Sequence, residues 1–307
     1  MRGRKFSSLM ILLLFLLFVP VLCYSQGVAV LVSSKSKIYM DALAGLKEAS
    51  KRTPNVYFLV GNKEGNNTVV QSLISSSPKV VCVIGDDAAS SVLPYRNGFP
   101  IIYCAVFNPL RLGLSGNNVT GVYIDVPIQG VLYMISNIAK PDSRVGILYN
   151  PRRNKGIVEQ AKREGARLGL RVMSLPIRSS KEVVTVLKAA KGRIDILYDS
   201  LGHPSELGDS FNVFPYLRQF CIENKIALVV PSENLVKTGA AVGVVADFKG
   251  IGRQAGEMVN QIMAGRTVKQ LPPEYPGFVK LVVNKKIIDL IGFKMPGEIM
   301  RQAVVIK

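Results

Sequence analysis

Residues 99–151 read FPIIYCAVFNPLRLGLSGNNVTGVYIDVPIQGVLYMISNIAKPDSRVGILYNP. Two apolar runs in this stretch, Ile101–Val106 and Arg144–Tyr149, are each followed closely by an Asn-Pro pair. Val119–Ile124 predicts a third strand, and the apolar spacing over residues 128–139 predicts an amphipathic helix that packs against a sheet. The stretch therefore predicts a bridge between two strand edges, each of which leads into a loop able to contact a ligand.

The rest of the chain alternates short β-branched runs with helical patterns, and the alternation starts again after the bridge, with five predicted strands in each half. Continuously apolar strands joined by helices are typical of parallel sheets covered on both faces. We therefore predict an α/β fold of two doubly wound parallel-sheet lobes joined by a hinge of crossovers. A single (β/α)₈ barrel is the alternative.

The tail contains a predicted helix over Gly250–Ala264 and a predicted strand over Phe278–Val283, and both are expected to return to the first lobe. Lobe I is then expected to take residues 26–124 and 248–283, and lobe II residues 125–247 and 284–307.

The N-terminus has the layout of a cleavable secretory signal peptide over residues 1–25. Basic residues precede an apolar run over residues 9–22, which is short for a membrane-spanning anchor. Small residues follow, and cleavage is expected after Ser25. A lipid anchor at Cys23 is disfavoured because Leu22 stands where a lipoprotein signal needs a small residue. We expect a periplasmic or otherwise extracytoplasmic protein.

The chain is strongly basic, with 39 Lys and Arg against 21 Asp and Glu and a formal net charge of +18. The basic residues are scattered, so we expect a solvated positive surface and no nucleic-acid partner. Three cysteines follow the signal, and this odd number argues against a disulfide framework, although a Cys82–Cys104 pair stays open. The single histidine, His203, has no ligand partner nearby, so no metal and no cofactor are predicted.

Polar and aromatic residues follow the predicted strands, where open parallel sheets bind their ligands. We expect a polar, partly aromatic pocket between the lobes. The predicted ligand contacts are Ser33, Ser34, Asp86, Asp87, Phe107 and Asn108 in the first half, and Asp125, Asn150, Asp199, His203, Ser232 and Asp247 in the second. For Asp87, Ser232 and Asp247, each close ahead of a predicted helix, capping is an equal alternative.

No catalytic residue is predicted, because no nucleophile with a positioned base is recognisable. The glycines of Gly250–Gly256 have the wrong spacing for a dinucleotide loop and indicate close helix packing instead.

Several segments, taken together and in order, resemble the family of ABC-transporter substrate-binding proteins that includes tryptophan and tyrosine binders. They are PIIYCAV at 100–106, NVTGV at 118–122, RVGILYNP at 144–151, GRQAG at 252–256 and LVVN at 281–284. The resemblance implies a type I periplasmic-binding fold, with a ligand held between two lobes that close on it and a membrane permease that recognises the closed form. Asn108, Asn150 and Asp247 match the loop pattern of the family.

Two departures from the family bear on the ligand. Leu201-Gly202-His203 stands where the family presents a Thr, Asp or Asn cluster, and Gly85-Asp86-Asp87 replaces a small or Thr-Pro type turn. The aromatic specificity of the family is therefore not carried over. We expect a monomeric, non-enzymatic binder of a small polar organic solute, such as an amino acid, that serves an ABC importer. The alternatives are a ligand-sensing subunit of a membrane receptor and an exported α/β hydrolase.

Overall fold

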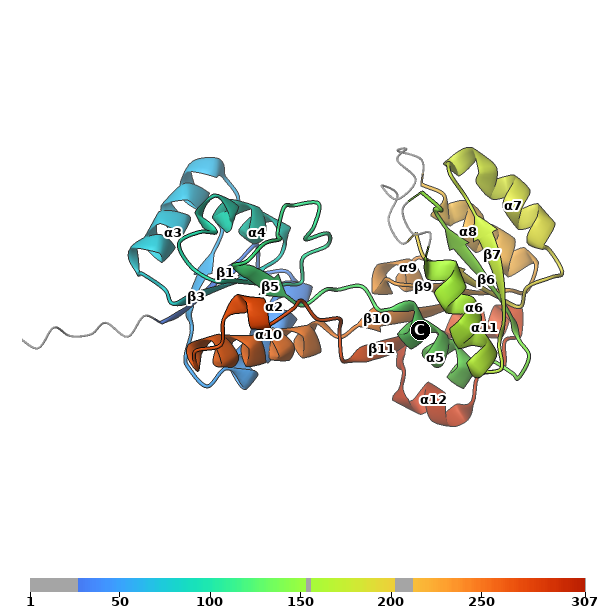
Figure 1. Ribbon diagram of the computed structural model, residues 1–307. Helices are drawn as coiled ribbons and strands as arrows, with labels where there is room; N and C mark the ends of the chain where they lie inside the picture. Colours follow the sequence, from blue (N-terminus) through green and yellow to red (C-terminus); the bar gives the residue numbers. More distant parts are fainter. Residues whose placement is uncertain (1–26, 153–155, 202–211, 307) are drawn as a thin grey trace, which may run out of the picture.

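The computed structural model describes residues 27–152, 156–201 and 212–306, which form two lobes joined by three chain segments (Figure 1). The predicted signal peptide, Cys23 and His203 lie outside the described residues. No helix of the described part is long and apolar enough to cross a membrane.

Lobe I is built on a five-stranded parallel sheet with the strand order β2-β1-β3-β4-β5. Its strands are β1 (Val28–Val32), β2 (Asn55–Phe58), β3 (Val80–Ile84), β4 (Ile101–Cys104) and β5 (Val119–Gly121). Successive residues of β1 point to opposite faces, and all are buried because helices cover both faces. Helices α2 (Lys37–Ala49) and α10 (Phe248–Met263) cover one face, and α3 (Lys63–Ser75) and α4 (Asp86–Val92) cover the other.

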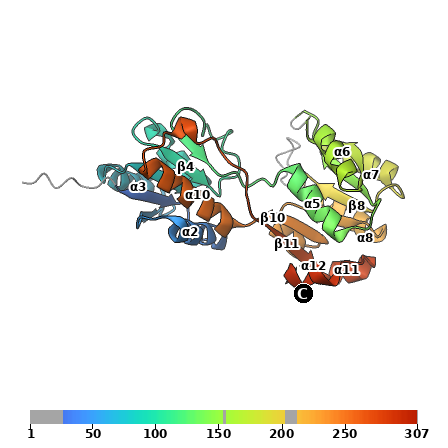
Figure 2. The ribbon, with the colours of Figure 1, turned by 60° about the horizontal axis from the view of Figure 1, so that its bottom comes forward.

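Helices α2 and α10 lie side by side although some two hundred residues separate them in the sequence (Figures 1 and 2). Glycines allow this close approach. A Cβ at Gly252 would clash with the carbonyl of Ala42, and one at Gly45 would clash with the carbonyl of Lys249. A Cβ at Gly256 would lie 2.7 Å from the Leu46 carbonyl oxygen, which is also too close. The interpretation of these late glycines as helix packing is therefore confirmed.

Lobe II is built on a seven-stranded sheet with the order β12-β11-β10-β9-β8-β6-β7, parallel except where β11 pairs with β10. Its strands are β6 (Arg144–Tyr149), β7 (Arg171–Pro176), β8 (Ile196–Asp199), β9 (Ala227–Val230), β10 (Val242–Ala246), β11 (Val279–Asn284) and β12 (Val304–Ile306).

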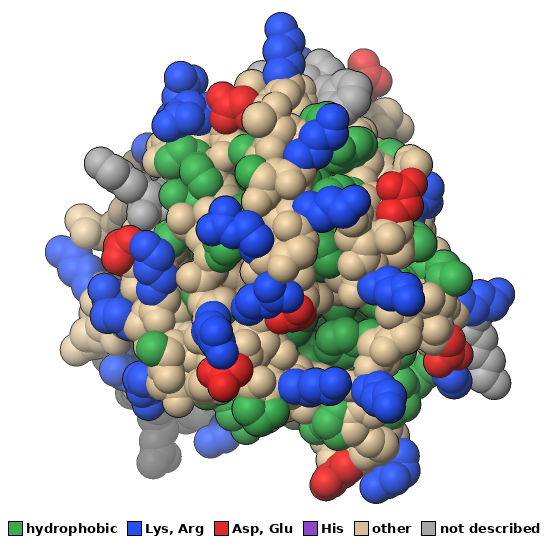
Figure 3. All heavy atoms as spheres, turned by 90° about the vertical axis from the view of Figure 1, so that its right-hand side faces the viewer, with side chains coloured by type: hydrophobic (Ala, Val, Ile, Leu, Met, Phe, Trp, Pro, Cys, Tyr) green, Lys and Arg blue, Asp and Glu red, His purple; other side chains and the backbone are tan. Residues whose placement is uncertain are grey.

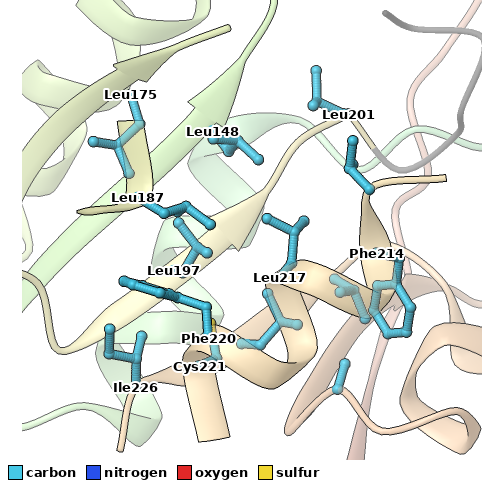
Figure 4. Packing of buried hydrophobic residues seen from close by; sticks show 14 of the residues in the cluster. Leu148, Leu175, Leu187, Leu197, Leu201, Phe214, Leu217, Phe220, Cys221 and Ile226 are labelled. Atoms are coloured by element: carbon cyan, nitrogen blue, oxygen red, sulfur yellow. The ribbon is translucent and has the colours of Figure 1, made fainter. Parts of the chain in front are cut away.

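Helices cover both faces of this sheet as well. One face carries α5 (Ile128–Ile138), α6 (Ile157–Arg167), α11 (Lys285–Ile291) and α12 (Gly297–Gln302), and the other carries α7 (Val183–Ala190), α8 (Phe214–Glu223) and α9 (Glu233–Lys237). Figure 4 shows Leu187, Leu197, Leu217 and Phe220 gathered in the core of the second face. Cys221 is buried in the same core as a free thiol.

The strand predicted over residues 278–283 does not return to lobe I, and this expectation was wrong. Strand β11 pairs antiparallel with β10, from Val242↔Val283 to Ala246↔Val279, so it belongs to lobe II. Its alternating side chains fill both cores of that lobe, with Val282 on one face and Leu281 and Val283 on the other. The preceding segment occupies the β5 edge of lobe I instead, where the Thr120 hydroxyl donates to the Leu271 carbonyl (2.6 Å).

The three segments that join the lobes are hydrogen-bonded to one another. The first crossover, residues 122–127, lies beside the third, residues 271–278, because Tyr123 N–H donates to the Glu274 carbonyl (2.8 Å). The second crossover is short, and Asp247 N–H donates to the Phe278 carbonyl of the third (3.0 Å). The hinge thus consists of three chain segments that are hydrogen-bonded to one another. The first crossover contains Ile124 and Asp125.

Candidate functional site

The loops at the carboxyl ends of the strands of both lobes lie on the sides that face the other lobe. The chain leaves lobe I at the carboxyl end of β5 and leaves lobe II at the carboxyl end of β10. Since the strands next to them run parallel, their carboxyl ends lie at the same edge. Lys37 of lobe I donates a hydrogen bond to the Asp41 carboxylate (2.7 Å), which raises the pKa of Lys37, and the charge of Glu233 in lobe II adds a smaller rise.

In lobe I, two of the predicted contacts tie neighbouring loops together. The Ser33 hydroxyl, which follows β1, accepts a hydrogen bond from the backbone N–H of Ala88 in α4 (2.9 Å). The Asp86 carboxylate, which follows β3, accepts one from the N–H of Phe107 after β4 (2.8 Å). These bonds hold three strand-end loops in one arrangement, so Ser33 and Asp86 build the edge on which other side chains are presented.

The remaining predicted contacts of lobe I are exposed. Ser34 accepts a long hydrogen bond from Ser36 N–H (3.4 Å), and Asn108 accepts one from Arg111 N–H (3.1 Å). The Phe107 side chain is 50% exposed. Among the described residues, the Asp87 carboxylate has no hydrogen-bond or ion-pair partner, and Gly85, rather than Asp87, holds the N-cap position of α4.

Tyr39 was missed by the sequence reasoning, although it lies at this edge. Its ring packs against the place where Gly85 lacks a side chain, and burial together with the charges of Asp86 and Asp87 raises the pKa of its hydroxyl. The signal available in the sequence was its position in the first turn of the helix that follows β1. Such a turn begins at the carboxyl edge of the sheet.

In lobe II, Asn150 and Asp199 are buried at the ends of β6 and β8. Asn150 accepts a hydrogen bond from Arg152 N–H (3.0 Å), and Asp199 accepts one from Leu201 N–H (3.1 Å). Burial, followed by the charges of Asp199 and Asp125, raises the pKa of Tyr198. Asp125 of the first crossover and Asp199 of β8 therefore both act electrostatically on the Tyr198 hydroxyl.

Ser232 and Asp247 both occupy N-cap positions, as the capping interpretation requires, but they differ in what they bind. The Ser232 side chain makes no capping hydrogen bond to α9. Asp247 accepts a hydrogen bond from Lys249 N–H (3.1 Å) and pairs with Lys280 of β11 (2.7 Å). Burial favours a higher pKa for Asp247, but the hydrogen bond and charge of Lys280, together with the backbone N–H groups of Lys249 and Gly250, outweigh burial and lower the pKa.

More ion pairs surround Asp247 at the hinge. Arg253 of α10 lies 3.8 Å from its carboxylate and stacks over the Phe278 ring at 5.2 Å. Glu48 of α2 in turn pairs with Lys249 (2.6 Å) and Arg253 (3.6 Å). The network links the second and third crossovers to two helices of lobe I, so Asp247 has a structural role whatever it does for a ligand.

Three tyrosines also meet at the hinge, and none was predicted. The Tyr123 ring lies 5.9 Å from the Tyr103 ring of β4 and 5.1 Å from the Tyr275 ring of the third crossover. Among the described residues, the Tyr103 hydroxyl is buried and has no hydrogen-bond partner. Only the folded hinge brings these residues together, because they come from segments far apart in the chain.

Within the described residues, no group of three or more His, Cys, Asp or Glu side chains is arranged to hold a metal ion. Cys82 and Cys104 are free thiols on adjacent strands of lobe I, and the Cys104 thiol and burial together raise the pKa of Cys82. Apart from His203, every predicted ligand contact thus lies at one of the two facing edges or in the crossovers between them.

The sequence model of the ABC transporter substrate binding protein family matches residues 27–307. The chain therefore belongs to this family, whose members are extracytoplasmic proteins that bind a small solute and work with an ABC transporter. The resemblance and the two-lobed α/β fold predicted from the sequence are both confirmed.

Individual relatives agree with this membership. The "Tyrosine-binding protein" of Clostridioides difficile (strain R20291) is 23% identical over 238 residues, 74% of this chain and 67% of that protein. The ligand-free, open structure of a substrate-binding protein with adhesive properties from Clostridium difficile matches with a TM-score of 0.68 and 20% identity. The match covers 92% of this chain and 99% of that chain. An ABC domain in complex with L-Trp from Streptococcus pneumonia matches with a TM-score of 0.54 and 21% identity. The match covers 91% of this chain and 100% of that chain.

Proposed function

We propose that this protein captures an amino acid, or a related solute that carries an ammonium group, between its lobes and delivers it to an ABC importer. The observation that carries the proposal is the placement of four carboxylates at the facing edges, Asp86 and Asp87 on lobe I and Asp125 and Asp199 on the side of lobe II. They gather there on a chain whose net charge is +18. Carboxylates in a partly closed site favour a cationic group.

Within this set, Asp87 is the side chain best placed to receive the ammonium group. Its carboxylate is exposed and has no partner among the described residues, whereas Asp86 already accepts the N–H of Phe107. Phe107, whose N–H donates to Asp86, lies at the same edge, and its half-exposed ring offers an apolar surface to the remainder of the solute. The tyrosine-binding relative and the complex with L-Trp support an amino acid as the class of ligand.

Binding then favours closure of the lobes. A solute that contacts both edges has more interactions in the closed state, so it shifts the population toward that state. The charge of Glu233 in lobe II acts on Lys37 in lobe I, and such opposite charges on the two lobes favour their approach. An importer that recognises the closed form discriminates in this way between the loaded and the empty protein.

Three further features belong to the same proposal. The protein is exported through the signal peptide at residues 1–25, acts as a monomer and performs no catalysis. The charge pattern of the N-terminus supports export, and the membership of a family of binding proteins supports a role without chemistry.

The test is calorimetric titration of the chain from Gln26 onward, which contains both lobes, with tyrosine, tryptophan and leucine and with their deaminated analogues. At 100 times its dissociation constant, a true ligand should stabilise the fold by about 2.7 kcal/mol in a parallel thermal melt. The analogues should bind at least tenfold more weakly, because a hydrogen bond to a charged group contributes roughly 1.5–3 kcal/mol.

Asp87→Asn should weaken the affinity for the amino acid by a similar factor. Asp142→Asn is the matched control, since Asp142 is an exposed carboxylate in the loop that precedes β6, at the opposite edge of lobe II. Equal affinity for an amino acid and its deaminated analogue would refute the assignment of the carboxylates. Binding of none of the amino acids would refute the ligand class.

A further inference from the structure

A hollow of about 660 Å³ lies in lobe II at the amino ends of its strands, on the side away from lobe I. Its walls are the loop before β6, the loop before β8 and the turns that follow α8 and α11. Figure 3 shows this end of the molecule, with Lys and Arg side chains spread widely over it and fewer Asp and Glu between them. The hollow is therefore separate from the edges assigned to the solute.

The lining residues carry an excess of positive charge. Five are basic, Lys140, Arg144, Lys191, Lys225 and Lys294, and two are acidic, Asp142 and Asp195, so the formal balance is 5 − 2 = +3. Both acids are already paired. The Asp195 carboxylate accepts hydrogen bonds of 2.6 and 3.0 Å from the Arg144 guanidinium. The Asp142 carboxylate lies 3.5 Å from the Arg171 guanidinium. The four lysines are exposed and have no ion pair among the described residues.

The arrangement of these charges favours an extended anionic surface over a small anion as the partner. A small anion that entered the hollow would approach the carboxylates of Asp142 and Asp195 and the carbonyl ends of α8 and α11, which repel it. The lysines stand around the hollow on long side chains, with their ammonium groups in solvent. Such a ring of cations complements an extended anionic surface better than a single bound anion.

We propose that Lys140, Lys191, Lys225 and Lys294, the distal basic face, rest on the anionic phospholipid headgroups of the membrane that holds the transporter. Such a contact keeps an extracytoplasmic protein close to the membrane that holds its transporter. The solute edges stay accessible, because the full length of the lobe II sheet separates them from the face. The contact needs the extracytoplasmic location but not any particular solute.

The test is co-sedimentation of the chain from Gln26 onward with phosphatidylcholine vesicles that contain either no phosphatidylglycerol or about a third. One variant carries Lys140→Gln, Lys191→Gln, Lys225→Gln and Lys294→Gln together. The matched control has the same net charge and carries Lys47→Gln, Lys51→Gln, Lys63→Gln and Lys79→Gln, four exposed lysines of lobe I that form no ion pair with any described residue. Thermal melts check that both variants fold.

The wild type and the control should bind only the anionic vesicles, and the distal variant should bind them at least 100-fold more weakly. Each lysine near an anionic surface contributes roughly a fivefold factor. Raising the salt from 0.05 to 0.5 M should abolish the binding, since surface charges are screened. Equal losses in both variants would mean that only the total charge matters and would overturn the proposal. Loss of vesicle binding in millimolar phosphate at constant ionic strength would overturn it in favour of a small-anion site.

Discussion

Asp247 serves the hinge in two ways, and two substitutions separate them. Asparagine caps a helix about as well as aspartate, so Asp247→Asn keeps the bond to Lys249 N–H and removes the ion pair with Lys280. Asp247→Ala removes both. The Asp247 side chain is only 14% exposed, but Lys280 is 46% exposed, so we expect the pair to contribute about 1 kcal/mol. In Asp247→Ala, the loss of the helix cap should lower the free energy of unfolding by about 1 kcal/mol more.

The assay is urea unfolding of wild type and variants at pH 7 and in acid. The pKa of Asp247 is lowered in the folded protein from its ordinary value of 3.8. The stabilisation from its charge is therefore fully present above that ordinary value and is lost as the pH falls through the lower folded-state pKa. The difference between wild type and Asp247→Asn should accordingly shrink toward zero in strong acid.

Asp142→Asn is again the control, because its ion pair with Arg171 is long and solvent-exposed, and we expect less than about 0.5 kcal/mol from it. A stability of Asp247→Asn equal to that of wild type at neutral pH would refute the structural role of the pair. A large loss of solute affinity without loss of stability would instead make Asp247 a ligand contact.

Three other substitutions test how the lobes are built. Gly252→Ala should destabilise the protein by roughly 1–3 kcal/mol, because its Cβ would clash with a carbonyl of α2, while Gly156→Ala, with open space around it, should change unfolding little. Ser33→Ala should cost about 1 kcal/mol through the lost bond to the first turn of α4, and the exposed Ser34→Ala should cost less than half of that; equal effects would contradict this. Tyr103→Phe should leave stability unchanged or raise it by about 1 kcal/mol, since the hydroxyl removed is buried without a partner; a clear loss in the melting temperature would show that the hydroxyl is bonded.

The predicted strands show how far periodicity reaches. The continuously apolar runs of β1 and β3 require cover on both faces, so a parallel sheet followed from the residues alone. Strand β11 has an equally good strand pattern, but that pattern does not say which sheet accepts it. The answer depends on which sheet edge is unoccupied when the chain returns, and that edge was β10.

The candidate contacts show a similar division. Polar residues at strand ends were recognised, because the strand ends themselves were recognisable. The sequence did not show what each of these side chains contacts. Ser33 and Asp86 accept hydrogen bonds from backbone N–H groups of other loops, whereas Asp87 and Phe107 are exposed. Tyr39 carries a local signal, its position in the first turn of the helix that follows β1, whereas the hinge tyrosines carry none.

The sequence by itself determined the class of fold, the two-lobed division around residues 99–151 and the family, because hydrophobic periodicity and the order of short motifs are local properties of the chain. The tertiary structure decided the pairing of β11, the ion-paired hinge around Asp247 and the exposure of each candidate contact. These depend on contacts between residues far apart in the chain, and such contacts exist only after both sheets have formed and their helices have packed.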